Sequence, residues 1–328
     1  MQEFIIEEND AAQRLDKYLK KILSEASGGF LYKMLRKKNI LLNGKKAEGS
    51  EKLVRGDVVR LYLSDETIAK FRTKQQEKGQ LASQYPVIPL EILYEDQELL
   101  VINKPSGMLS QKAKATDISA NEYIIGYLLS TGKITPEELT HFKPSVCNRL
   151  DRNTSGILIA GKTLYALKQM AESLQQHSVQ KYYYCLVLGL LSKEERLEGW
   201  LIKDERTNRV RISKTGTGME GESQERYICT EYRPVRLLSR QNLTLLEVHL
   251  VTGRSHQIRA HLASIGHPIV GDPKYGSLKV NEQFRKDCRV THQLLHAGRL
   301  VLADGKTIEA PLPAVFTEIL TRESRKEA

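Results

Sequence analysis

An aspartate between two arginines is the strongest candidate for chemistry in this 328-residue chain. Asp151 lies between Arg149 and Arg152, in a polar turn that precedes the apolar run at residues 157–160. Neighbouring positive charge favours the ionised carboxylate, which is the form that a nucleophile or base requires. An aspartate in such a basic turn is more often a structural ion pair, so these residue types alone leave both interpretations open.

A longer pattern favours the catalytic interpretation. Residues 148–156 read N-R-L-D-R-N-T-S-G, which resembles H-R-L-D-x-x-T-S-G, the signature of the Rlu-type (ribosomal large-subunit) pseudouridine synthases. In that family the aspartate is catalytic, which implies the same role for Asp151. The family's arginine helps to occupy the space that a flipped base vacates, which implies an RNA contact for Arg149. Asn148 stands where the family usually has histidine, so the role of this side chain stays open.

Three further stretches resemble the same family in the same order. Residues 103–107, N-K-P-S-G, are similar to its early N-K-P-x-G turn, and residues 179–183 are similar to its V-x-K-x-Y strand. The family's active-site tyrosine then falls on Tyr183. Strand alternation places this side chain on the same face as Cys185, so an ordinary core tyrosine is the alternative.

The longest match covers residues 252–262 and continues through residues 266–272. We expect a helix here, with Ser255 as its N-cap and a stop at Gly266. The family's active-site basic residue maps onto Arg254, which would pair with the catalytic carboxylate or with a phosphate. Lys104 and Arg152, which belong to matched stretches, are also predicted to contact RNA.

The N-terminal region carries much of the positive charge. Between residues 11 and 46 there are ten Lys or Arg residues against two acidic ones. Apolar spacing predicts two short helices, Asn43-Gly44 predicts a hairpin, and residues 58–63 alternate as a strand. This order resembles the S-four-like RNA-binding domain, although a solvated helix face is the alternative. The predicted RNA contacts here are Lys33, Arg36, Lys37 and Lys38.

These patterns predict an α+β protein. We expect an RNA-binding domain of two helices and a hairpin at residues 1–64, and a polar linker at residues 65–84. A pseudouridine synthase domain should follow at residues 85–328, with mixed α+β structure and a large, mainly antiparallel sheet. Strands outnumber helices in this part of the sequence without a steady alternation, which argues against a doubly wound sheet.

Two stretches match the residue patterns of cofactor-binding motifs but not the secondary structure that these motifs require. Residues 156–163 fit the phosphate-loop pattern, but their middle is an apolar run that predicts a buried strand. Residues 216–221 fit the G-x-G-x-x-G fingerprint, yet they follow a basic stretch and precede a strand, where a hairpin loop is more plausible. His256 and His261 are five residues apart with no third ligand at metal spacing. We therefore predict neither a cofactor nor a metal.

Composition supports a polyanionic partner. The formal net charge is +10, and no apolar stretch is long enough to cross a bilayer. The N-terminus shows no signal peptide, and the four widely spaced cysteines fit free thiols, so we expect a cytoplasmic protein, a monomer without membrane contact.

The sequence therefore predicts an RNA pseudouridine synthase that isomerises uridines in structured RNA, with Asp151 as the essential carboxylate and no cofactor. Ribosomal RNA is the expected partner and transfer RNA the second choice. The alternatives are a non-catalytic RNA-binding or ribosome-assembly protein, a base-excising glycosidase and a phosphate-loop NTPase.

Overall fold

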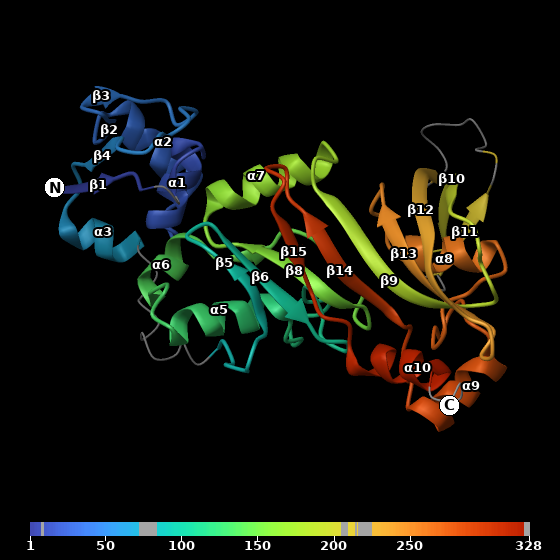
Figure 1. Cartoon of the computed structure of the whole chain (residues 1–328). Helices are drawn as coiled ribbons and strands as arrows, with labels where there is room; N and C mark the ends of the chain where they lie inside the picture. Colours follow the sequence, from blue (N-terminus) through green and yellow to red (C-terminus); the bar gives the residue numbers. More distant parts are fainter. Residues whose placement is uncertain (8–9, 72–83, 205–208, 214, 216–224, 325–328) are drawn as a thin grey trace.

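The chain forms two β-sheets with separate cores, shown in Figure 1 for a computed structural model. The structure describes residues 1–7, 10–71, 84–204, 209–213, 215 and 225–324. The small sheet lies at one end of an elongated molecule, and the helices that precede the C-terminus lie at the other.

The small sheet has the order β1-β4-β2-β3 and is covered by short helices. Its elements are β1 (Gln2–Ile5), α1 (Leu15–Ile22), α2 (Gly28–Arg36), β2 (Ile40–Leu42), β3 (Lys45–Lys46), β4 (Val58–Leu61) and α3 (Asp65–Phe71). The two predicted helices and the hairpin are confirmed. Asn43 and Gly44 both have positive φ, 51° and 72°, as a tight hairpin turn requires.

Helix α3 lies within the stretch that the sequence predicted to be linker. Ile68 is 1% exposed and belongs to the core of the small sheet, and the Phe71 ring lies 4.5 Å from that of Phe30. The apolar spacing of Ile68 and Phe71 within a polar segment is what the prediction missed. The N-terminal module, here residues 1–71 as far as they are described, therefore extends beyond residue 64.

The large sheet has eleven strands among the described residues and follows the order β11-β10-β12-β13-β9-β14-β8-β6-β5, with β15 on β14 and β7 on β8. The strands are β5 (Ile92–Glu95), β6 (Leu99–Lys104), β7 (Ser145–Val146), β8 (Ser155–Gly161), β9 (Gln180–Leu188), β10 (Glu195–Asp204), β11 (Arg209–Ser213), β12 (Glu225–Leu238), β13 (Leu243–Leu250), β14 (Leu295–Val301) and β15 (Thr307–Glu309). Neighbouring strands pair antiparallel except β8 with β14. The prediction of a large, mainly antiparallel sheet is confirmed.

Helices pack around this sheet (Figure 1). They are α5 (Ala120–Ser130), α6 (Pro136–His141), α7 (Leu164–Gln175), α8 (Gln257–Ser264), α9 (Leu278–Cys288) and α10 (Ala314–Ser324). Helix α7 contacts β8, and α8 contacts β11 and β12. Within the described part of the chain, no helix combines the length and apolar character needed to span a bilayer.

Strand β8 is buried along its whole length, which confirms the predicted strand at the phosphate-loop match. At its start Gly156 has a φ of 108°, and a Cβ there would lie 2.2 Å from the carbonyl oxygen of Ala297 on β14. Only glycine allows this close approach of the two strands. The other letter match, residues 216–221, lies outside the described residues.

Candidate active site

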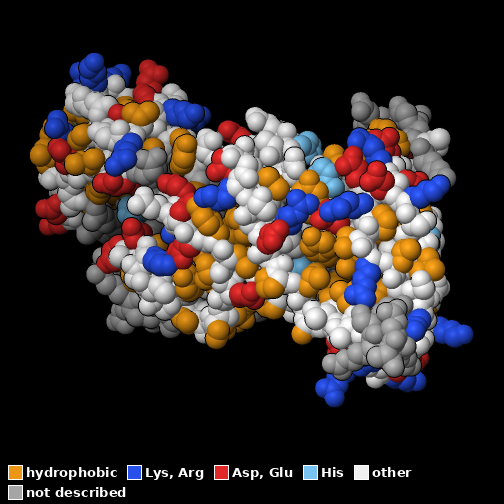
Figure 2. Space-filling model, viewed as in Figure 1, with side chains coloured by type: hydrophobic (Ala, Val, Ile, Leu, Met, Phe, Trp, Pro, Cys, Tyr) orange, Lys and Arg blue, Asp and Glu red, His pale blue; other side chains and the backbone are white. Residues whose placement is uncertain are grey.

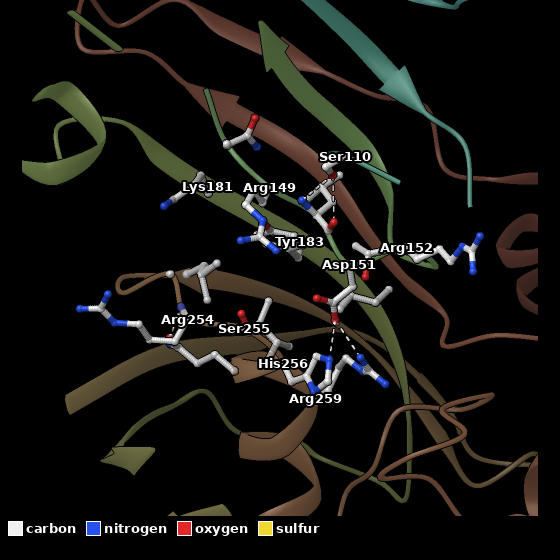
Figure 3. Close-up of a pocket in the computed structure, with 18 of the residues that line it drawn as sticks. Ser110, Arg149, Asp151, Arg152, Lys181, Tyr183, Arg254, Ser255, His256 and Arg259 are labelled. Carbon is white, nitrogen blue, oxygen red and sulfur yellow. Dashed lines mark hydrogen bonds and ion pairs between the residues drawn. The ribbon is translucent and has the colours of Figure 1, made fainter. Parts of the chain in front are cut away.

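A cavity of about 830 Å³ lies where three distant segments meet (Figure 3). The first is the loop at residues 147–154, which leads into β8. The second is β9, which contributes Lys181 and Tyr183, and the third is the loop at residues 252–256 with the first turn of α8. The structure thus brings together Asp151, Tyr183 and Arg254, as the sequence predicted.

Asp151 lies in a tight turn at the wall of this cavity. Its peptide carbonyl accepts a hydrogen bond from the backbone N–H of Thr154 at 3.0 Å. The side chain is 27% exposed, so the carboxylate is reachable from the cavity. One oxygen, Oδ2, lies 2.7 Å from Nη1 of Arg259 and 3.9 Å from Nε2 of His256.

Arg259 bridges two carboxylates. Its Nε and Nη2 donate to the fully buried Asp272 at 2.7 and 2.9 Å, and Nη1 donates to Asp151. Burial acts to lower the pKa of Arg259, but the hydrogen bond and charge of Asp272, followed by those of Asp151, outweigh it and raise the pKa above its usual range. The guanidinium is a permanent cation whose planar fork binds Asp272 through two hydrogen bonds, while Nη1 donates a single one to Asp151.

Arg254 does not make the predicted pair with Asp151. Its side chain is exposed at the cavity wall and has no hydrogen bond or ion pair with any residue that the structure describes, while its backbone N–H donates to Gln257. The residue that holds the carboxylate, Arg259, stands five positions later in the same motif. The sequence contained one indication that this arginine is buried: it follows Ile258 in the apolar pattern of α8. A phosphate contact for Arg254 stays a prediction.

The start of α8 differs from expectation in a way that shapes the site. The helix begins at Gln257, and its N-cap is His256 in a left-handed conformation, not Ser255. The buried Gln257 side chain accepts hydrogen bonds from the Thr252 hydroxyl and the Arg254 N–H, at 2.9 and 3.1 Å. This side chain fixes the loop that places the His256 ring beside Asp151.

His256 lines the cavity beside Asp151, a position that the sequence did not predict. Its Nδ1 lies 3.0 Å from the Tyr275 hydroxyl. Burial lowers the pKa of His256, and the charge of Asp151 acts in the opposite direction. No group of three or more potential His, Cys, Asp or Glu metal ligands occurs in the described ranges.

Tyr183 lines the cavity from β9 and is 6% exposed. Burial, and then the negative charge of Asp151, raise the pKa of its hydroxyl well above the usual range. The side chain therefore stays a neutral phenol. It offers a ring face or edge to a base and a hydroxyl that can donate a hydrogen bond.

Lys104 is not the RNA contact that the sequence predicted. It is fully buried, and its amine donates to the carbonyls of Pro105, Met108 and Arg152 at 2.9, 2.9 and 3.0 Å. Burial lowers the pKa of Lys104 to about 7, and the charge of Asp151 opposes this shift. The amine thus links the turn after β6 to the loop that contains Asp151. The sequence does not show that carbonyl groups from these two segments converge on one lysine.

The other predicted RNA contacts are at the surface. Arg149 and Arg152 are exposed at the cavity, and Arg152 donates to the carbonyl of Gly107 at 3.3 Å. The basic face, defined here as Lys33, Arg36, Lys37 and Lys38, is exposed on α2 and the turn that follows it. Figure 2 shows Lys and Arg side chains on this end of the molecule.

Asn148 has a clear structural role. Its side-chain oxygen accepts from the N–H of Ile159 at 2.8 Å, and its side-chain nitrogen donates to the carbonyl of Ile157 at 3.4 Å. The amide thus bonds to the backbone of β8 and holds the start of the loop at residues 147–154 against this strand.

Known proteins resemble the chain over nearly its whole length. A family model described as RNA pseudouridylate synthase matches residues 98–264. Ribosomal large subunit pseudouridine synthase C of Vibrio cholerae is 31% identical, with 97% of this chain and 95% of that protein covered. Ribosomal large subunit pseudouridine synthase D of Nitrosomonas europaea is 30% identical over 97% and 86%. The fold resembles the human RNA pseudouridylate synthase domain containing 4 structure, with a TM-score of 0.57, 21% identity and coverage of 71% and 93%.

Proposed function

This chain belongs to the RNA pseudouridylate synthase family, and on that basis we propose that its substrate is large-subunit ribosomal RNA. It is an RNA pseudouridine synthase, an isomerase, as the sequence predicted. The observation that carries the proposed role of its site is the carboxylate of Asp151, fixed by Arg259 at the wall of a cavity. The names of relatives at about 30% identity support the ribosomal target.

The reaction breaks the bond between the sugar C1′ and N1 of uracil and forms a bond from C1′ to C5. The hydrogen on C5 leaves, and N1 gains one, so atoms balance without a cofactor. We propose that the target uridine flips into the cavity and packs on Tyr183 while Arg149 supports the gap. The carboxylate of Asp151 then starts cleavage, as a nucleophile or as a base.

The charge of the cavity fits a polyanionic substrate. Among its described lining residues, Asp151 is the single carboxylate, whereas six are Lys or Arg: Arg149, Arg152, Lys181, Arg254, Arg259 and Lys274. Arg259 is already neutralised by two carboxylates. The remaining cations supply the excess positive charge that RNA phosphates require.

We propose that the N-terminal module is a separate RNA-docking domain, joined to a catalytic domain that begins near residue 85. Its own sheet and core support the division, and its exposed basic face supports the docking role. We also propose that the protein acts as a monomer in the cytoplasm, where the net positive charge suits nascent ribosomal RNA.

Pseudouridine mapping with and without the gene tests the proposed target. We expect at least one pseudouridine in large-subunit ribosomal RNA to disappear when the gene is deleted and to return with the wild-type gene. Loss confined to transfer RNA would contradict the ribosomal target while leaving the reaction intact.

Neutralising the basic face tests the docking role. We expect Lys33→Gln, Arg36→Gln and Lys37→Gln together to weaken RNA binding and to reduce the slope of log affinity against log salt by about 2 to 3, because each lost phosphate contact removes roughly 0.7 to 0.9. The matched control carries three glutamines on α9, at Lys279, Arg285 and Lys286, which are also exposed. Equal losses in both variants would indicate a general charge effect and contradict specific docking.

A further inference from the structure

The cavity wall contains a lysine whose charge nothing in the described structure offsets. Lys181 lies on β9, two residues before Tyr183, so both side chains face the cavity. Strand geometry separates their Cα atoms by roughly 7 Å. The amine of Lys181 makes no hydrogen bond or ion pair with any residue for which the structure gives a position.

The surroundings of this amine place it away from the reacting carboxylate. A Cβ at Gly253 would lie 3.5 Å from Nζ of Lys181, so the amine lies against the loop that precedes Arg254. Figure 3 shows Lys181, Arg149 and Arg254 on one side of the cavity, and Asp151 with its partner Arg259 on the other. The cavity thus has a side without carboxylates, where an anion would meet three cations.

The pKa of Lys181 indicates that this side of the cavity lacks a negative charge. Burial lowers the pKa of Lys181, which reflects the cost of a cation held partly out of water without a counter-charge. Arg259, which is more deeply buried, has two carboxylates instead. An uncompensated cation at the wall of a substrate cavity is stabilised when the substrate brings the negative charge.

We propose that Lys181, together with Arg254, binds a backbone phosphate adjacent to the target uridine while the base packs on Tyr183. The amine is a substrate-binding group, and it does not take part in proton transfer. This inference rests on the RNA pseudouridine synthase activity but is independent of which RNA is the target.

The test compares Lys181→Met with Lys181→Arg on a large-subunit ribosomal RNA transcript labelled with tritium at C5 of uridine, because isomerisation releases that tritium. We expect Lys181→Met to raise KM about 10-fold, as the loss of one charge-assisted contact implies, and to leave kcat within about twofold. The slope of log kcat/KM against log salt should fall by about 0.7 to 0.9. Lys181→Arg should restore both values because it keeps the charge.

Competition by small probes locates the interaction in the cavity. Uridine 3′,5′-bisphosphate should inhibit the wild-type enzyme more strongly than uridine, and Lys181→Met should abolish most of this difference. Lys279→Met, a control at an exposed site on α9, should leave it unchanged. The melting temperature of Lys181→Met should stay at or above that of the wild type, because an unpaired, partly buried charge is removed.

Two results would overturn the inference. A fall in kcat without a change in KM, not rescued by Lys181→Arg, would assign the amine to the chemistry. An unchanged KM and salt slope would show that it does not meet the substrate. If the wild type releases no tritium from ribosomal RNA, the proposed target fails, and the same comparison runs on transfer RNA transcripts with the same expected ratios.

Discussion

Replacing Asp151 by asparagine is expected to reduce kcat by roughly 10⁴-fold or more, since the amide can act neither as a nucleophile nor as a base. RNA affinity should fall little, because the cations that meet phosphates stay in place. The measurement is tritium release from C5-labelled RNA at saturating substrate, with binding followed separately by filter retention or anisotropy.

The fold of this variant should persist. Arg259 keeps its two hydrogen bonds to the buried Asp272, and the pair that is lost is partly exposed, so the free energy of unfolding should change by no more than about 1 kcal/mol. Asp287→Asn, at an exposed carboxylate on α9, is the matched control and should retain full activity. Near-normal turnover by Asp151→Asn would eliminate the proposed role of this carboxylate.

Arg259→Lys should impair both stability and activity. A lysine carries the same charge, but its single amine cannot reproduce three hydrogen bonds to Asp272 and Asp151. Losing charge-assisted bonds at a buried carboxylate should destabilise the protein by roughly 2 to 3 kcal/mol. A displaced Asp151 carboxylate should lower kcat about 100-fold. Urea unfolding and tritium release measure the two effects.

Arg254→Lys separates the two arginines of this motif. Arg254 is exposed, and its side chain has no partner within the described residues, so the conservative change should leave the urea midpoint unaltered and kcat within a few-fold. If Arg254→Lys instead abolished turnover while Arg259→Lys was benign, the ion pair of Arg259 would not be the one that serves catalysis.

Local patterns predicted most of the elements that position the site. Apolar spacing and turn residues predicted the helices and hairpin of the N-terminal module, and the apolar run at residues 157–160 predicted the buried strand β8. These features depend on neighbours in sequence, which is why they could be predicted. The turn that contains Asp151 could be predicted for the same reason, because the predicted strand β8 determines where this turn ends.

Contacts between distant segments could not be predicted in this way. Which arginine reaches Asp151 depends on where α8 begins, and that is decided by the buried side chain of Gln257, which bonds to β12 and to its own loop. Lys104 is buried because carbonyls from two segments converge on it, one of them 48 residues away. Because lysine is charged, the sequence suggested that Lys104 is exposed. Its burial is possible because three carbonyl groups accept hydrogen bonds from its amine.

The close approach of Gly156 to Ala297 also has a consequence for synthesis of the chain. Strand β8, which follows the loop that contains Asp151, is held by β14, a strand that leaves the ribosome about 140 residues later. The N-terminal module has its own core and can fold first. A growing chain would therefore complete the proposed docking surface early and the proposed catalytic site last, so that an unfinished chain would meet RNA before it is able to modify it.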